Sequence, residues 1–312
     1  MNQDNFIFNE QDVQNKIFVS VHIVTYMHEN FISKCIEGIL MQKTNFDFEI
    51  IIHDDASTDN TPLIISKFEQ KYPNKFKVIY QFENQYVNFG FENIKKQMFS
   101  LSSGKYIAFC EGDDYWIDNY KLQKQVDFLE TNKDYIIHSG SAKIIRNNQL
   151  TEEIIGSHDF ISKSYQLEDF YHQNNLVNCT VMFKNIIDIN DSIFFNNTLY
   201  GDWYMYVLLL KKTNKKAYRS NELFSVYRFH EKGFYGGMDL FKNYDEHLKH
   251  ILFLKQTLKY KVFSYSTIEN INNLSCEKFK ILLSKKKIFS AIKVLLYNIY
   301  LTKYNFSLKR YL

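Results

Sequence analysis

Three short apolar runs in the first third of the chain each end abruptly in polar or acidic residues, and this recurrence constrains the fold most. The runs cover residues 17–25, 48–53 and 106–110, and they have the length and β-branched content of buried strands. Residues 31–41 and 91–101, which lie between or beside them, carry apolar side chains at helical spacing. Strands that alternate with helices of about ten residues predict right-handed βαβ units and a mostly parallel sheet.

Two further segments fit the same alternation. Thr61 and Pro62 form a helix start, since threonine caps a helix and proline suits its first position. Residues 76–80 predict another strand. In open parallel sheets, ligands bind outside the carboxyl ends of the strands. The polar clusters at residues 25–29, 54–59 and 111–114 all fall at that edge, so we expect them to form one site.

The third cluster is the most acidic. Glu111, Asp113 and Asp114 place three carboxylates within four residues. Carboxylates this close repel one another and resist desolvation, so a cation is expected beside them. Their hard oxygen atoms suit Mg²⁺ or Mn²⁺, and such an ion would bridge a diphosphate. The alternative is a solvated acidic turn without a ligand.

Glycine-rich phosphate loops do not occur in the sequence. No Gly-x-Gly-x-x-Gly follows the first predicted strand, and no Gly-x-x-x-x-Gly-Lys-Ser/Thr is present. With only ten glycines in 312 residues, a glycine-rich loop cannot be the main cradle for phosphates. A metal ion held by carboxylates is the remaining common way to neutralise a diphosphate.

Four motifs, taken in order, resemble those of family 2 glycosyltransferases with the GT-A fold. They are Val19-Ser20-Val21 with Thr25-Tyr26, the run from Phe48 to Asp59, the acidic Glu111-Gly112-Asp113-Asp114, and Gly201-Asp202-Trp203. The resemblance implies an α/β nucleotide-diphospho-sugar transferase fold, in which helices flank a mostly parallel, Rossmann-like sheet. We therefore expect a catalytic domain at residues 1–235 and a helical, basic and amphipathic C-terminal region at residues 236–312.

The resemblance also implies an inverting transfer from a nucleotide sugar, with UDP expected, to an acceptor hydroxyl by a single displacement. Four residues are expected at the donor nucleotide, with the last recognising the base: Thr25, Tyr26, Glu29 and Asp55. Asp113 would hold Mn²⁺ or Mg²⁺ together with Glu111, which stands where many relatives have aspartate. Asp202 would act as the general base. Its alternative role is an ordinary helix N-cap.

A second group of residues is expected at the acceptor or in a lid: Asp114, Trp116, Arg228 and His230. Three of the ten glycines follow His230 closely, at positions 233, 236 and 237. This glycine content indicates a mobile loop that would bring Arg228 and His230 to the diphosphate or the metal. A plain surface turn is the alternative.

The last part of the chain is strongly basic. From residue 277 to residue 312 there are nine basic residues and one acid, although the whole chain carries a net charge of only +3. Isoleucines and leucines between residues 281 and 299 recur at helical spacing, with lysines among them. This pattern predicts one basic amphipathic helix that either lies on an anionic membrane or packs on the catalytic domain.

Four scattered cysteines without Cys-x-x-Cys spacing favour reduced thiols, and no signal peptide is visible. We therefore expect a cytoplasmic enzyme, peripheral at the inner face of the plasma membrane. Its expected partners are a nucleotide-sugar donor and a glycan or lipid-linked acceptor of bacterial polysaccharide synthesis, and not nucleic acid. Two other functions remain open: a non-catalytic nucleotide- or carbohydrate-binding protein on the same scaffold, and a nucleotidyltransferase. The latter would be expected to carry a glycine-rich basic loop after the first strand, which residues 24–30 lack.

Overall fold

The computed structural model describes residues 17–156, 161–171, 173–195, 200–230, 246–247, 249–251, 253–254 and 265–302 of the chain. The chain divides into two compact units. The first comprises Met1–Tyr165, Leu176–Asn197 and Leu208–Arg228, and the second comprises Gln166–Asn175, Thr198–Val207 and Phe229–Leu312. The boundary expected between residues 235 and 236 stays a prediction.

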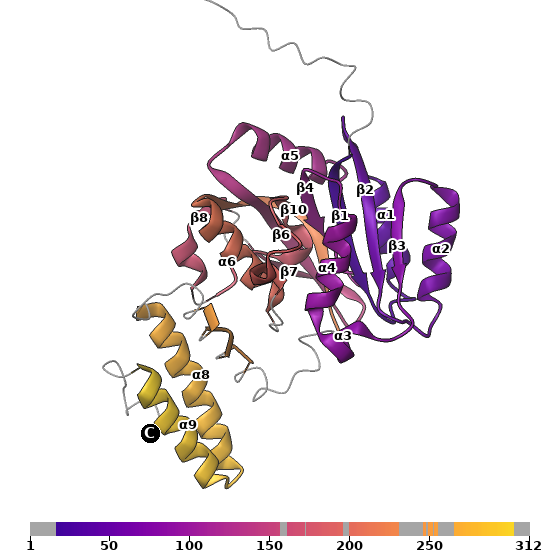
Figure 1. The fold of residues 1–312 in the computed structure, drawn as a ribbon. Helices are drawn as coiled ribbons and strands as arrows, with labels where there is room; N and C mark the ends of the chain where they lie inside the picture. The colour runs from indigo at the N-terminus through magenta and orange to yellow at the C-terminus, as the bar shows by residue number, and fades with distance from the viewer. Residues whose placement is uncertain are drawn as a thin grey trace, which may run out of the picture. The chain divides into compact units, whose positions relative to one another are not determined.

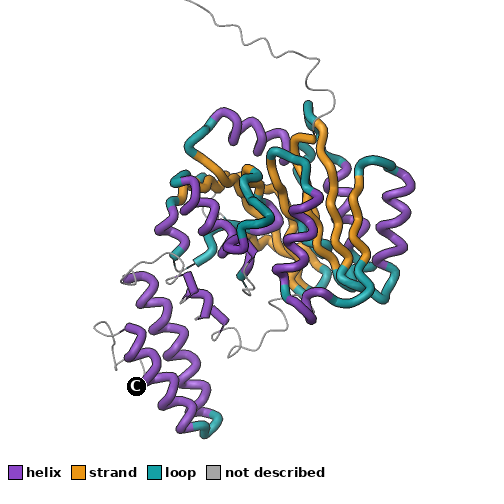
Figure 2. The backbone as a smooth tube through the Cα atoms, viewed as in Figure 1, coloured by secondary structure: helices purple, strands orange, loops and turns teal. Residues whose placement is uncertain are grey.

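The described strands, orange in Figure 2, are β1 (Ile17–Thr25), β2 (Asp47–Asp54), β3 (Phe76–Tyr80), β4 (Tyr106–Phe109), β5 (Tyr115–Trp116), β6 (Tyr135–Arg146), β7 (Gln149–Ile155), β8 (Lys163–Tyr165), β9 (Met182–Lys184) and β10 (Lys216–Phe229). The described α-helices are α1 (Ile32–Leu40), α2 (Thr61–Lys71), α3 (Gln85–Phe89), α4 (Phe91–Leu101), α5 (Lys121–Thr131), α6 (Gly201–Thr213), α8 (Tyr265–Ser284) and α9 (Ile288–Thr302). Short 3-10 helices lie at Leu167–Phe170, Asn178–Thr180 and Ser192–Phe195.

Within the described residues, the strands form one sheet in the order β3-β2-β1-β4-β9-β6-β10-β5 (Figure 1), with β7 beside β6 and β8 beside β10. β1 pairs in parallel with both β2 and β4, and β2 pairs in parallel with β3. The parallel arrangement predicted from the sequence is confirmed for these four strands. Beyond β4 the pairs β4–β9, β9–β6, β6–β7 and β10–β5 are antiparallel.

Helices cover both faces of the parallel strands. Val19 and Ile23 of β1 belong to the main apolar core, which also contains residues of α1, α2 and α5. Ile51 of β2 faces the other side, where it packs with Ile94 and Met98 of α4. Burial on both faces explains why these strands are continuous apolar runs rather than alternating ones.

The structure follows the sequence-based expectation closely in the first hundred residues. β1 and β3 begin and end at the predicted residues, and α4 does so as well, whereas β4 ends one residue early at Phe109. The short helix α3 was not expected. The backbone N–H groups of its first two residues donate to the side chain of Asp55, about thirty residues earlier in the chain.

The prediction of a single basic helix across residues 281–299 is wrong. Two helices are present instead, α8 and α9, because the chain turns at residues 285–287. Lys286 has a φ of 56°, and the backbone N–H of Lys287 donates to the carbonyl oxygen of Leu282 at 2.8 Å, which closes α8. Of the helices in the described part of the chain, none is long and apolar enough to cross a bilayer.

Candidate functional site

The loops that follow β1 and β2 are joined by hydrogen bonds at the carboxyl edge of the sheet. The backbone N–H of Met27 donates to Ser57 Oγ at 2.8 Å, and that of His28 donates to Thr61 Oγ1 at 2.9 Å. Glu29 accepts from the backbone N–H of Asn60 at 3.0 Å. Two of the three polar clusters predicted to share one site therefore lie together. Glu29 itself ties the two loops, and its donor-binding role stays a prediction.

Asp55 is buried directly after β2 and organises α3. Its two carboxylate oxygens accept from the backbone N–H groups of Gln85, at 2.6 Å, and Tyr86, at 3.0 Å. Asn84 adds an ordinary cap by accepting from the N–H of Val87 at 2.8 Å. A carboxylate has about four acceptor positions, so these two bonds leave room for a further donor such as a base N–H.

The acidic loop after β4 lies against the end of β1. The backbone N–H of Gly112 donates to the carbonyl oxygen of Val24 at 3.0 Å. A Cβ atom at Gly112 would lie 2.7 Å from Thr25 Oγ1 and 2.8 Å from His28 Nδ1. The backbone of the third cluster therefore approaches the first cluster at a distance that only glycine permits. Glu111 accepts a hydrogen bond from the Asn178 side chain.

Gly112→Ala is expected to weaken donor binding about tenfold, or about 1.4 kcal/mol. The added methyl group forces apart the loop that carries Asp113 and the strand end that carries Thr25. Calorimetric titration with UDP in the presence of Mn²⁺ measures this loss. Asn119→Ala, at an exposed position just beyond the same loop, is the control and should bind UDP like the wild type. Equal affinity of both variants would show that the close approach has no part in donor binding.

Asp114 is buried and bonds to the end of β10. Its Oδ1 accepts from the backbone N–H of Arg228 at 2.7 Å, and the Arg228 Nε donates to the carbonyl oxygen of Asp113 at 3.0 Å. Burial raises the pKa of the Asp114 carboxyl well above its usual range, and the charges of Asp113 and Glu111 raise it further. Asp114 therefore fastens the end of β10 to the acidic loop. Its acceptor role stays a prediction.

Trp116 is likewise buried, and it rests on an unexpected lysine. The Lys121 ammonium lies 3.9 Å from the centroid of the Trp116 ring and donates to Gln125 Oε1 at 2.7 Å. The indole N–H of Trp116 donates to the carbonyl oxygen of Cys179 at 2.8 Å. Lys121 is fully buried, and this burial lowers its pKa to about 7. These contacts fix the Trp116 side chain two residues after the acidic loop. The acceptor role of Trp116 stays a prediction.

The lowered pKa of Lys121 predicts how stability depends on pH. An unfolded lysine titrates near 10.4, so above about pH 7 the unfolded chain binds more protons than the native chain. The free energy of unfolding should therefore rise with pH, by about 1.4 kcal/mol per unit from this group. Urea unfolding of Lys121→Met between about pH 7 and 8.5 should lack that rise.

Cysteines in the unfolded chain are half ionised near pH 8.5, and their contribution to the slope is common to all variants, so it cancels when the variants are compared. Lys67→Met, an exposed lysine on α2, is the matched control and should keep the wild-type pH slope. Identical slopes for the two variants would contradict a neutral Lys121 in the native protein.

Asp113 and Glu111 remain as the carboxylates of the acidic loop that are half-buried rather than buried. Among the residues that the structure describes, no three His, Cys, Asp or Glu side chains converge closely enough to hold a metal by themselves. One or two carboxylates with substrate phosphates and water are the usual Mg²⁺ environment in nucleotide enzymes. The donor set of the loop therefore fits a cation that arrives with a diphosphate.

Asp202 belongs to the second unit, where it lies in the first turn of α6. The Asn174 side chain donates to Asp202 Oδ2 at 3.0 Å, and the neighbouring Trp203 is fixed by its indole N–H, which donates to the carbonyl oxygen of Phe170 at 2.8 Å. Burial raises the pKa of Tyr200 to about 12, with Glu246 and Asp202 contributing negative charge. The predicted base is thus held in a defined orientation.

The predicted lid is described only at its beginning. Arg228 closes β10 with the contacts given above, and its guanidinium lies 4.4 Å from the centroid of the Phe31 ring. His230 is half-buried. The glycines at positions 233, 236 and 237 lie outside the described residues, so the mobile loop stays a prediction.

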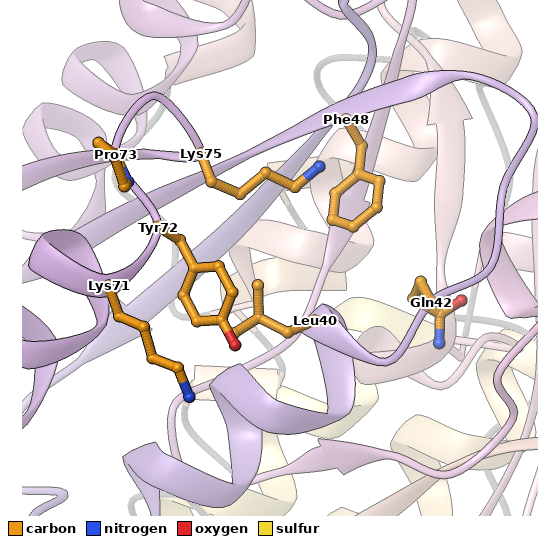
Figure 3. Close-up of a pocket in the computed structure, with 7 residues that line it drawn as sticks. All are labelled: Leu40, Gln42, Phe48, Lys71, Tyr72, Pro73 and Lys75. Atoms are coloured by element: carbon orange, nitrogen blue, oxygen red, sulfur yellow. The ribbon is translucent and has the colours of Figure 1, made fainter.

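A separate hollow lies at the opposite end of the parallel strands (Figure 3). Its lining includes Leu40 at the end of α1, Phe48 near the start of β2 and Lys71 at the end of α2. The Lys75 ammonium lies 3.5 Å from the centroid of the Phe48 ring, and burial lowers the Lys75 pKa. This hollow is at the amino edge of β2 and is distinct from the strand-end site.

Two supporting residues were missed by sequence reasoning: Lys121, which contacts the Trp116 ring, and Asn174, which bonds to Asp202. No local pattern marks them, since lysine and asparagine are ordinary surface residues.

Comparisons with known proteins agree with this geometry. An uncharacterized protein of Mycobacterium tuberculosis is 29% identical over 69% of this chain, which spans 60% of that relative's length. The Escherichia coli UDP-Glc:alpha-D-GlcNAc-diphosphoundecaprenol beta-1,3-glucosyltransferase WfgD is 25% identical over 67% of this chain and 76% of its own length. Staphylococcus aureus TarS 1–349, solved in complex with UDP, has the same fold, with a TM-score of 0.54, 17% identity and coverage of 95% and 89% of the two chains.

The sequence model of Glycosyl transferase family 2 matches residues 20–188, which hold most of β1, all of β2 and the acidic loop. Likeness to solved glycosyltransferases supports the GT-A fold that the strand order displays. Because the family model covers more than half of the chain, the chain belongs to glycosyl transferase family 2.

Proposed function

We propose that this glycosyltransferase moves a sugar from UDP-sugar to an acceptor hydroxyl with inversion at the anomeric carbon. The observation that carries the proposal is the meeting of three strand-end loops at one edge of the sheet, with Gly112 packed against Thr25 and His28. This edge offers a base-binding carboxylate and hard oxygen donors within one site. The printed names of two similar proteins, which include UDP-Glc and UDP, support the uridine nucleotide.

The residues of the first unit bind and orient the donor. Asp55 accepts a base N–H with an acceptor position that α3 leaves available. The exposed Tyr26 follows Thr25, whose carbonyl oxygen accepts from the backbone N–H of Asp55 at 3.0 Å. Asp113, with Glu111, would hold Mn²⁺ or Mg²⁺. When bound, this ion would neutralise the diphosphate and stabilise it as the leaving group. Arg228 keeps the acidic loop in place through Asp113 and Asp114.

Asp202 takes the proton of the acceptor hydroxyl as that oxygen attacks the anomeric carbon. The new glycosidic bond forms while the bond to the diphosphate breaks, and the electron pair leaves with the diphosphate. Asn174 orients the carboxylate for this transfer. A lipid-linked glycan is the acceptor class we propose, supported by the diphosphoundecaprenol in the name of the WfgD relative.

A panel of nucleotide sugars, assayed for nucleoside diphosphate release with and without Mn²⁺, tests the proposal. Release should be greatest with one UDP-sugar and should require the metal and an acceptor lipid carrying a sugar diphosphate. If the protein binds UDP-sugars but releases no nucleoside diphosphate with any acceptor, the non-catalytic alternative is favoured instead.

Asp55→Ala is expected to raise the donor KM about tenfold while changing kcat little, because it removes an interaction common to ground and transition states. Calorimetry should also show that the wild type binds UDP more tightly than ADP. Asn84→Ala is the matched control, since it removes the side-chain cap of α3 and a bond to the Asp55 carbonyl oxygen but keeps the Asp55 carboxylate. Equal KM values for the two variants would mean that Asp55 serves only to order α3.

A further inference from the structure

Helix α9 exposes a continuous apolar stripe. Large apolar side chains whose exposed fractions run from 38% to 86% form it: Ile288, Phe289, Ile292, Leu296 and Ile299. At 100° per residue these positions fall within an arc of about 100° on the helix surface. Isolated exposed apolar residues are common on proteins, but five on one helix face form a patch that calls for an apolar partner.

A different face of α9 packs against α8, which lies beside it in Figure 1. Ala291 and Asn298 are fully buried, and the Asn298 side chain donates to Asn272 Oδ1 of α8 at 2.8 Å. Ala291 and Asn298 lie seven residues apart and thus share one side of the helix. The α8–α9 pair therefore does not use the stripe to hold itself together.

The charged residues of α9 itself and of the turn before it are all positive, and the preceding acidic residue in the sequence is Glu277 of α8. Residues 278–302 contain six lysines and no acidic residue. Lys285, Lys286 and Lys287 are exposed in the turn that precedes the stripe, and Lys293 is exposed within α9. An apolar stripe on a helix whose own charged residues are all cations complements a surface that is both apolar and anionic, as the interface of a bilayer with acidic lipids is.

We propose that α9 lies in the plane of an anionic membrane surface, with the stripe at the boundary of the acyl chains and the lysines among the head groups. This inference deepens the proposed function, on which its biological setting rests, by naming the surface that meets the membrane of a lipid-linked acceptor. The 15-residue α9 lies on the bilayer rather than crossing it.

Sedimentation of the full chain with vesicles tests the inference without any substrate. Vesicles of phosphatidylcholine with about one third phosphatidylglycerol should bind at least tenfold more protein than pure phosphatidylcholine vesicles, and added salt should reduce this difference. Phe289→Ser with Leu296→Ser should lower the binding about tenfold or more, since it removes two of the five large apolar side chains of the stripe. Exchange of Lys285–Lys287 for glutamate should remove the preference for anionic lipid.

Leu63→Ser is the matched control, because Leu63 is an equally exposed leucine on α2 and should leave vesicle binding unchanged. Circular dichroism confirms that each variant is folded. Equal binding by the stripe variants and the control overturns the inference. So does a wild type that is dimeric in light scattering and becomes monomeric in the stripe variant, because a second copy then covers the stripe. If the full chain binds anionic vesicles but transfers sugar from none of the nucleotide sugars, the proposed function is refuted and the membrane inference stands.

Discussion

Asp113→Asn is expected to lower the rate of sugar transfer at least about a thousandfold without unfolding the protein, a loss typical of removing a main electrostatic stabiliser of the transition state. The neutral side chain keeps the shape of aspartate but cannot offer the charged oxygen that a divalent cation prefers. Turnover and the dependence of UDP binding on Mn²⁺ should therefore be lost together. Rate assays and calorimetry at several Mn²⁺ concentrations measure the two effects.

The fold should tolerate Asp113→Asn well. Asp113 contributes negative charge that raises the pKa of the buried Asp114, so its neutralisation relieves repulsion rather than breaking a bond. The Arg228 side chain bonds the backbone oxygen of residue 113, and this contact survives the exchange. Asp118→Asn is the matched control, because it removes a nearby carboxylate that pairs with Lys124 instead. Undiminished turnover of Asp113→Asn in excess chelator would contradict the metal assignment.

The parallel half of the sheet could be predicted because its signals are local. β1 and β3 are buried between helices, so their apolar runs end where the strands end. The antiparallel half gives no such signal. β6 carries the polar sequence Ser139-Gly140-Ser141 in its buried centre, where Thr180 supplies hydrogen bonds from another segment. A partner that is distant in sequence decides whether such residues can be buried.

The candidate site likewise has features that the sequence predicts and features that it does not. Carboxylates at strand ends are visible in the sequence, because topology alone brings them to one edge. The direction in which each carboxylate points depends on tertiary contacts, and Asp114 turns inward to Arg228 while Asp113 stays half-buried. Lys121 was not foreseen for a related reason, since a buried lysine requires an aromatic ring and an amide oxygen placed by other parts of the chain.

Asp202→Asn is expected to lower kcat by at least about a thousandfold while the donor KM changes less than about threefold, because a general base acts on the transition state and not on donor binding. The substitution separates the two roles open to this residue. The structure places Asp202 in the first turn of α6 rather than at its N-cap, and asparagine has nearly the same size and shape, so a purely structural Asp202 would leave the rate near that of the wild type. Asparagine also keeps an oxygen that can accept the hydrogen bond from Asn174.

Asn174→Ala supplies an intermediate case. It leaves the Asp202 carboxylate in place but removes the amide that orients it, so kcat should fall about tenfold and no further. Asp191→Asn, which removes a carboxylate paired with Lys212, is the control for a general loss of charge and should keep the wild-type rate. Steady-state rates with saturating UDP-sugar and a lipid-linked acceptor separate the three variants. A kcat of Asp202→Asn within about tenfold of the wild type would move the general base to another residue, since loss of a base typically costs 10²–10⁴ in rate.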